Sequence, residues 1–179
     1  MEEQHKKKPE HMTNLRGSEL VCKDDARIVF RGVLDSAYAT CVMCQVSARD
    51  EKHDALVGHL SDVLRCMRSI MRAHVNGEPV PPLFVMGMDE ETIHDASHHP
   101  DKHFGVAHFM PDWRMGQTMA WLNLLRTKLR EAECVAVKAY GEEGITQRED
   151  LLRGINRLSS AAYVLMCQLA GGAYGEIGG

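Results

Sequence analysis

The chain has 179 residues, which fits a single domain, and 44% of them are hydrophobic, which is enough for a substantial core. Its 25 acidic residues outnumber its 21 lysines and arginines, so a formal charge of −4 gives no basic footprint for nucleic acid or an anionic membrane. No apolar run approaches the roughly 18 residues of a membrane span, and the polar start lacks an apolar signal core. We therefore expect a cytoplasmic protein.

The amino-terminal stretch is polar and shows little apolar periodicity. Its run of three lysines is followed by Pro9, which interrupts any helix. We expect residues 1–25 to form a flexible, mostly irregular lead, residues 26–171 to form one helical domain, and residues 172–179 to be a loose tail.

Two long amphipathic helices are predicted in the first half of the chain. The first covers about residues 25–49, and Asp50 is predicted to cap a second that runs to about residue 76. His74 continues the inward apolar stripe of this second helix. A stretch with one glycine and three prolines, residues 77–82, then stops it, because proline cannot continue the hydrogen-bond ladder.

Six cysteines are scattered along the chain, and two of them form a Cys41-x-x-Cys44 motif. Such a pair could be half a metal site or a redox pair. However, both cysteines lie on one apolar helical stripe, which favours burial as small hydrophobic residues. The stripe consists of Phe30, Val33, Ala37, Cys41, Cys44 and Ala48.

A long connector follows the second helix and is predicted to hold one short helix over residues 89–97, capped by Asp89 or Glu90. Half of the ten histidines lie in this connector: His94, His98, His99, His103 and His108. His94 and His98 are spaced to bind a transition metal if their segment is helical. A di-metal bundle needs more Glu-x-x-His motifs than the single one present, so we expect these histidines to line or cap a pocket.

The next helix carries two stripes side by side. Its apolar stripe, which faces the core, consists of Met115, Met119, Leu122, Leu125, Leu129, Ala132 and Ala136. Arg126, Arg130 and Glu133 form a second stripe at the edge of the packed face. Two guanidinium groups one turn apart can grip a polyphosphate, because each offers a planar fork of donors. The alternative is a solvated helix face on which Glu133 pairs with Arg130.

The last helix is predicted to begin at a capping box, residues 146–149, and to end near Gly171 and Gly172. The four long amphipathic helices and their connections predict an all-α, up-and-down bundle, with the short connector helix as a fifth element.

Several motifs resemble the cobalamin adenosyltransferases, most closely the ethanolamine-utilisation branch of that superfamily. The resemblance rests on the Arg126-xxx-Arg130-xx-Glu133 helix followed by an Asn156-Arg157-Leu158-Ser159 helix. Further similar segments are residues 27–36, 70–73, 77–79, 97–100 and 122–128. Together they cover about residues 12–169.

The resemblance implies transfer of the 5′-deoxyadenosyl group from ATP to reduced cobalamin, with release of triphosphate and with Mg²⁺ accompanying ATP. By the same resemblance, Arg126 and Arg130 would contact phosphates or ribose, Glu133 would orient an arginine or the nucleoside, and Asn156 would bind the nucleotide. Lys128, on another face of the helix, is a weaker candidate. Ser160 stands where many relatives carry an aspartate paired with the first arginine, and serine also occurs there in the ethanolamine branch.

The resemblance also implies roles for residues in two other segments. Gly17 and Ser18 lie where relatives wrap the triphosphate with a glycine-rich segment, and they could supply backbone and hydroxyl donors. Phe104, Phe109 and Trp113 are candidates for the aromatic groups that exclude the lower axial ligand of cobalt. Ordinary packing of these aromatic residues under a loop is the alternative.

The resemblance also implies a homo-oligomer, with a trimer favoured and ATP sites between subunits. It further implies two partners, a reductase and an adenosylcobalamin-dependent enzyme, and a location in association with a bacterial microcompartment. The metal-binding region that precedes the helical domain in the ethanolamine branch is expected to be absent, so no metal site is predicted. Two alternatives remain: a weakened carrier that binds corrinoid or ATP without turnover, and a metal-binding bundle that uses the histidine-rich connector.

Overall fold

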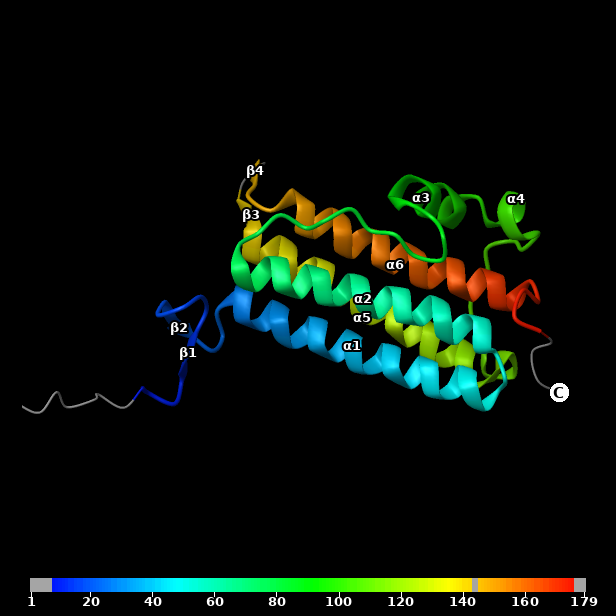
Figure 1. The fold of residues 1–179 in the computed structure, drawn as a ribbon, viewed down its shortest axis with the longest axis horizontal. Helices are drawn as coiled ribbons and strands as arrows, with labels where there is room; N and C mark the ends of the chain where they lie inside the picture. The colour runs from blue at the N-terminus through cyan, green and yellow to red at the C-terminus, as the bar shows by residue number, and fades with distance from the viewer. Residues whose placement is uncertain (1–7, 143–144, 176–179) are drawn as a thin grey trace, which may run out of the picture.

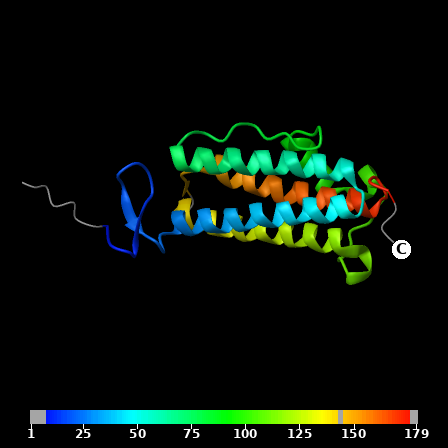
Figure 2. The ribbon, with the colours of Figure 1, turned by 60° about the horizontal axis from the view of Figure 1, so that its bottom comes forward.

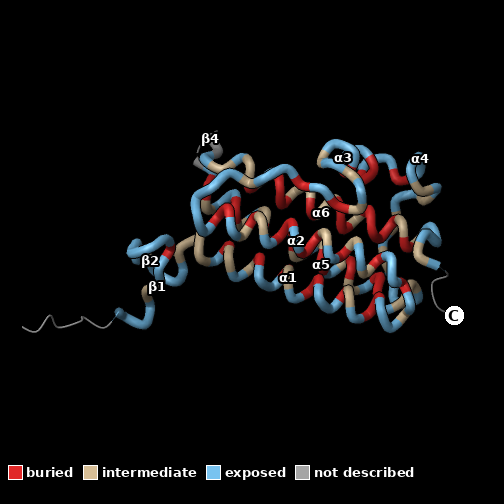
Figure 3. The backbone as a smooth tube through the Cα atoms, in the orientation of Figure 1, coloured by how far each residue is buried: buried red, intermediate tan, exposed pale blue. Residues whose placement is uncertain are grey.

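Four long helices pack side by side in the computed structural model, which describes residues 8–142 and 145–175 (Figure 1). They are α1 (Ala26–Asp50), α2 (Asp54–Asn76), α5 (Gly116–Tyr140) and α6 (Glu149–Ala170). Each helix turns an apolar stripe inward, and the buried residues follow the centre of the bundle in Figure 3. The predicted all-α bundle is confirmed. None of the described helices is long and apolar enough to cross a membrane.

The Cys41-x-x-Cys44 motif belongs to this core. Both cysteine side chains are fully buried. Burial raises the pKa of the Cys44 thiol to about 12, and it raises that of Cys41 still further, so neither is a ready thiolate. The structure therefore confirms the hydrophobic interpretation of this pair.

Neighbouring helices are antiparallel throughout, yet the chain does not simply alternate in direction. α2 and α5 run the same way, because the connector after α2 travels back along the bundle before α5 begins (Figures 1 and 2). The connector contains α3 (Glu90–His98), α4 (Pro100–Phe104) and the 3₁₀ helix η1 (Trp113–Met115). The predicted short helix is α3, which Asp89 caps by accepting a hydrogen bond from Thr92 N at 2.8 Å. α4 and η1 were not predicted.

Two predicted helix starts are wrong. Asp50 is the last residue of α1, and α2 begins after His53, which makes no side-chain capping bond. In the turn between α1 and α2, Lys52 has a positive φ of 63°. Residues 51–53 therefore form the turn that reverses the chain, and the second helix begins after them. The last helix does not begin at Thr146 either, because that residue belongs to a strand and α6 begins after Arg148, which makes no side-chain capping bond. That strand, β4 (Ile145–Thr146), pairs with β3 (Gly141–Glu142).

The described parts of the lead and of the tail contain regular structure and contacts that the sequence did not predict. Within the lead, β1 (Met12–Asn14) and β2 (Leu20–Cys22) form an antiparallel hairpin that projects beyond one end of the bundle (Figure 2). We call this the hairpin end; there α1 and α6 begin and α2 and α5 finish. At the opposite end, Tyr174 of the expected loose tail bonds to α2, with its hydroxyl 2.8 Å from His59 Nδ1. Residues 1–7 and 176–179 lie outside the described residues.

Candidate functional site

The packing of α5 determines which of its polar residues reach solvent. Leu125 and Leu129 are fully buried against the bundle, and each is followed directly by an arginine. Because consecutive helical residues are separated by about 100° around the axis, Arg126 and Arg130 come out at the edge of the buried stripe, one turn apart. The second stripe predicted from the sequence is therefore present.

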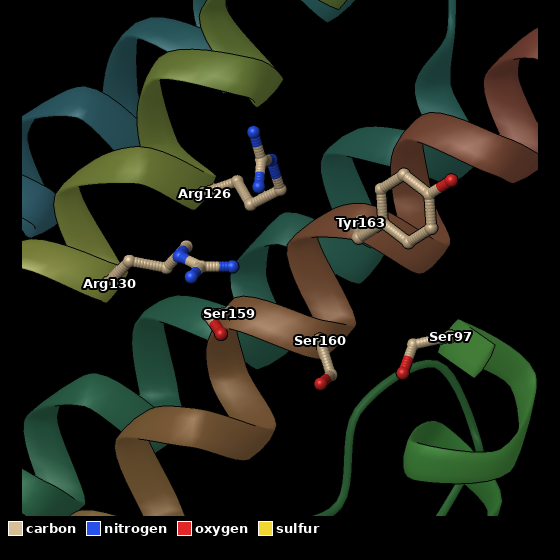
Figure 4. Close-up of a pocket in the computed structure, with 6 residues that line it drawn as sticks. All are labelled: Ser97, Arg126, Arg130, Ser159, Ser160 and Tyr163. Atoms are coloured by element: carbon tan, nitrogen blue, oxygen red, sulfur yellow. The ribbon is translucent and has the colours of Figure 1, made fainter. Parts of the chain in front are cut away.

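A cavity of about 240 Å³ opens beside these arginines. It is lined by Ser97, Arg126, Arg130, Ser159, Ser160 and Tyr163. The two guanidinium groups extend from α5 toward α6, which supplies Ser159, Ser160 and Tyr163, while Ser97 comes from α3 (Figure 4). Three elements far apart in the sequence therefore meet at one polar cavity.

The two arginines keep donors available. Arg126 donates from Nε and Nη2 to the single oxygen Oδ1 of Asn123, at 3.2 and 3.0 Å, which leaves Nη1 without a bond to a described residue. Arg130 makes no ion pair and no side-chain hydrogen bond with any residue in the described ranges. The alternative pairing of Arg130 with Glu133 is therefore not seen.

Glu133 instead belongs to a network that joins α5 to α6. Its Oε1 accepts a hydrogen bond from Asn156 Nδ2 at 3.0 Å, and Asn156 Oδ1 accepts one from Arg157 Nη1 at 2.7 Å. Since both ends of the amide are engaged, its orientation is fixed. Glu133 and Asn156 thus lie together, as expected of one site, but both stand beside the cavity rather than among its lining residues.

Tyr163 forms an aromatic wall of the cavity. Its hydroxyl lies 2.8 Å from His108 Nδ1, and the ring of Phe109 is 6.3 Å away, centroid to centroid. Burial raises the pKa of Tyr163 to about 12, so the phenol is neutral at physiological pH. The connector is thereby tied to the cavity through His108 and Phe109.

The remaining predicted site residues lie elsewhere in the chain. Lys128 forms an ion pair with Glu131 at 2.7 Å and does not line the cavity. Phe104 is half-buried in α4, and Trp113, in η1, is 84% exposed. Gly17 and Ser18 lie in the turn between β1 and β2, at the hairpin end, so one chain does not bring them to this cavity (Figure 1).

Three lining residues were missed as site residues: Ser97, Ser159 and Tyr163. Ser159 and Tyr163 are four residues apart on α6 and flank Ser160, so helical spacing could have placed all three on one face. Ser97 carries no such signal, because its approach depends on how α3 packs against α6.

The connector histidines engage each other and a carboxylate. The rings of His94 and His98 stack at 4.3 Å between centroids, and His103 Nε2 lies 2.7 Å from Asp95 Oδ2. Within residues 8–142 and 145–175, no group of three histidine, cysteine, aspartate or glutamate side chains is arranged to hold a metal ion. The metal-binding alternative therefore gains no support from the described residues.

The chemistry of the cavity favours an anion. Two guanidinium groups and three serine hydroxyls surround it, and no carboxylate is among its lining residues. A guanidinium that no carboxylate neutralises offers charge-assisted donors, and phosphate oxygens match its planar fork. The cavity can therefore hold phosphate groups of a ligand whose apolar part contacts Tyr163.

Comparison with known proteins points in the same direction. A family model described as cobalamin adenosyltransferase matches residues 4–169. The chain is 38% identical over 161 residues to the corrinoid adenosyltransferase EutT of Escherichia coli (strain K12), which covers 89% of this chain and 59% of that protein. The protein of the same name from Salmonella typhimurium (strain LT2) is 37% identical over the same length. The chain thus spans about three fifths of the curated relatives it matches.

Proposed function

Because the chain belongs to the cobalamin adenosyltransferase family, we propose that it transfers the 5′-deoxyadenosyl group of ATP to reduced corrinoid cobalt and releases triphosphate. The relatives that carry the name corrinoid adenosyltransferase support this activity. The cavity at Arg126 and Arg130 is proposed as the place where the phosphates of ATP bind.

One observation carries this assignment. Arg126 and Arg130 point into the same polar cavity, one turn apart, and neither is neutralised by a carboxylate of the described residues. Arg126 is partly buried, where an uncompensated charge is unfavourable, and Arg130 lies beside it on the exposed side of the helix. Two such arginines facing one cavity are best explained by an anionic ligand with several oxygens.

The proposed reaction makes modest chemical demands on the protein. Reduced cobalt attacks C5′ of ATP, and the C5′–O bond breaks with its electron pair leaving on the triphosphate. The protein therefore needs no nucleophilic serine or cysteine; it must orient ATP in line and stabilise the departing charge. Arg126 and Arg130 supply that stabilisation, while Asn156, held by Glu133, positions the nucleoside.

Mg²⁺ is proposed to accompany ATP. The cavity offers hydroxyl groups but no carboxylate among its lining residues, so the ion would be held mainly by phosphate oxygens. It would neutralise part of the triphosphate charge alongside the two arginines. Ser97, Ser159 and Ser160 supply neutral oxygen atoms that line this cavity.

The corrinoid is proposed to approach from the connector. Phe109 packs beside Tyr163, so aromatic surface already borders the cavity there. Phe104 and Trp113, in the same connector, would extend that surface toward the face of cobalt that must lose its lower ligand. Trp113 is 84% exposed, as expected of a side chain whose partner is a bound molecule.

A homo-oligomer, with a trimer favoured, completes the proposal. α1 exposes the large apolar residues Val42, Met43 and Val46 by 38 to 49% each, and Leu124 on adjacent α5 by 40%. A second copy of the chain is the proposed cover for this surface. Such packing would also let Gly17 and Ser18 of one subunit serve the cavity of another. We include a cytoplasmic, microcompartment-associated location, a separate reductase and an adenosylcobalamin-dependent enzyme in this proposal.

An anaerobic spectroscopic assay tests the proposed activity. The 179-residue chain is mixed with chemically reduced cob(I)alamin and Mg-ATP, and conversion to light-sensitive adenosylcobalamin is followed together with triphosphate release. We expect the two products in equal amounts and none without ATP. Binding of corrinoid or ATP without conversion would instead favour the carrier.

A further inference from the structure

A second group of arginines surrounds a buried histidine at the hairpin end of the bundle. His74, in the last turn of α2, is 1% exposed, and its Nδ1 is hydrogen-bonded to the hydroxyl of Tyr140 at the end of α5. We assign the tautomer in which the phenol donates to Nδ1 and the imidazole hydrogen lies on Nε2. Nε2 is buried and has no hydrogen-bond partner among the described residues.

Burial and four neighbouring arginines both disfavour the charged form of His74. Arg31, Arg16, Arg148 and Arg27 all lie close enough to disfavour its protonated form. Two of them also carry a buried nitrogen without a described partner, namely Arg31 Nε and Arg148 Nη1. The unsatisfied atoms here are all nitrogens of cationic or N–H-bearing groups, so a complementary ligand must supply acceptor oxygens.

A cavity of about 280 Å³ opens at this cluster. Arg16, Arg27, Arg148 and His74 line it, and Glu19 is its single acidic lining residue. With neutral His74, the lining charge is three positive groups against one negative. At roughly 30 Å³ per water molecule in the liquid, the space suffices for a tetrahedral oxyanion with some of its waters.

Arg16 is held in place rather than free in solvent. Its Nη2 donates to the carbonyl oxygen of His74 at 3.2 Å. Its guanidinium also lies against Gly77, where an added Cβ would come within 2.8 Å of Nη1 and where φ is +74°. No carboxylate of the described chain pairs with it. Arg16 is thus a positioned cation that the surrounding protein leaves without a counter-ion.

We propose that this cavity is a binding site for a phosphate group, held by Arg16, Arg27 and Arg148 with Nε2–H of His74 at its inner wall. The site is distinct from the cavity at Arg126 and Arg130, with which it shares no lining residue. Arg27 already pairs with Asp25 at 2.7 Å and with Glu19 at 3.4 Å, and Arg148 pairs with Asp150 at 2.9 Å. Arg16 is therefore the residue whose donors depend most on the ligand.

The test is a titration of the full chain with inorganic phosphate at constant ionic strength, followed by nitrogen-detected NMR of the histidine side chains. We expect saturable binding that shifts the His74 Nε2 resonance and raises the pKa of His74 from about 4, because a nearby anion favours the imidazolium. Arg16→Gln should weaken binding roughly tenfold or more, since a charge-assisted hydrogen bond is lost. Arg16→Lys should recover part of it.

Two controls locate the effect. Arg49→Gln, which removes an exposed charge at the opposite end of α1, should leave phosphate binding unchanged. Arg130→Ala should leave the shift of the His74 resonance unchanged, so the result is independent of turnover and of the proposed function. The titration is then repeated with ADP in the Arg130→Ala chain. The ligand with the lower dissociation constant shows whether the site takes free phosphate or the phosphate of a nucleotide. Equal affinities for Arg16→Gln and Arg49→Gln, or no response of His74 to either ligand, would overturn the proposal.

Discussion

The two arginine clusters of this bundle use the same side chain in different ways. In the middle of α5, Arg126 and Arg130 face hydroxyl groups and no carboxylate lines their cavity. At the hairpin end, Arg27 and Arg148 are each paired with an aspartate two residues away in sequence, and Arg148 also donates to the carbonyl of Glu78. The partners of an arginine, rather than its presence, determine how many of its donors remain for a ligand.

Replacing Arg130 by alanine should have the largest effect on activity of any single change in the first cluster. If Arg130 stabilises the departing triphosphate, kcat/KM should fall by roughly 10²–10³-fold, as when one preorganised donor to a developing charge is removed. Stability should change by less than about 0.5 kcal/mol, because Arg130 is exposed and unpaired among the described residues. Anaerobic steady-state kinetics and urea unfolding measure the two quantities.

Arg49→Ala is the matched control for this change. It removes an exposed arginine from α1 and should leave kcat/KM and stability near those of the wild type. Similar losses of activity in both variants would contradict a specific role for Arg130.

The arginine cluster around His74 should make the stability of the folded chain depend on pH. Burial, followed by the charges of the neighbouring arginines, lowers the pKa of His74 to about 4 from an ordinary 6.5. The unfolded chain therefore binds a proton between these values that the folded chain does not, and stability falls as the pH is lowered through this window. The loss should approach about 3 kcal/mol at full protonation. Urea unfolding at pH 7, 5.5 and 4.5 measures it.

A His74→Gln variant separates the effect of His74 protonation on the free energy of unfolding from the effects of other groups that titrate in acid. It should unfold more easily at pH 7, and its stability should depend less on pH between 6.5 and 4. Asp150, whose hydrogen bond to Arg148 lowers its pKa to about 2, loses its contribution only in more acidic solution and so stays outside this window. An unchanged slope in His74→Gln would contradict the assignment.

The link between Glu133 and Asn156 is expected to have an intermediate effect. Asn156→Asp replaces a donor 3.0 Å from Glu133 Oε1 by a carboxylate, so two negative groups would face each other. We expect a stability loss of about 1–3 kcal/mol and weaker ATP binding. Adding Glu133→Gln to this variant should recover much of the stability, because an amide can again donate to the new carboxylate. Additive losses in the double variant would break the proposed link.

Lys128→Ala should have the smallest effect. Its ion pair with Glu131 is exposed, and such pairs contribute roughly 0–1 kcal/mol. Because the ammonium group does not line the cavity, kcat/KM should stay within about twofold of the wild type. Such a change in activation free energy is smaller than the loss of one transition-state contact would cause. A loss comparable to that of Arg130→Ala would show that Lys128 turns toward the ligand.

Local periodicity predicted the long helices and both stripes of α5, because the spacing of apolar residues fixes which side of a helix is buried. It did not predict β3 and β4, whose strands are two residues long and too short to show alternation. It predicted that His74 continues the stripe of α2, but not that Tyr140, 66 residues away, bonds to it.

The site could be predicted in part for the same reason. Arg126 and Arg130 were identified from spacing and resemblance and Ser160 from resemblance alone, and all three line the cavity. Ser97 lies in the similar segment 97–100, but its place at the cavity was not predicted, because it depends on the packing of α3 on α6. Gly17 and Ser18 lie at the far end of the same chain, so any role for them depends on how subunits assemble.

A crystal structure of the chain with Mg-ATP would test the central assignment most directly. We expect triphosphate oxygens within hydrogen-bond distance of Arg126 and Arg130, with the nucleoside near Asn156. A nucleotide bound elsewhere, with both guanidinium groups still facing solvent, would contradict the assignment.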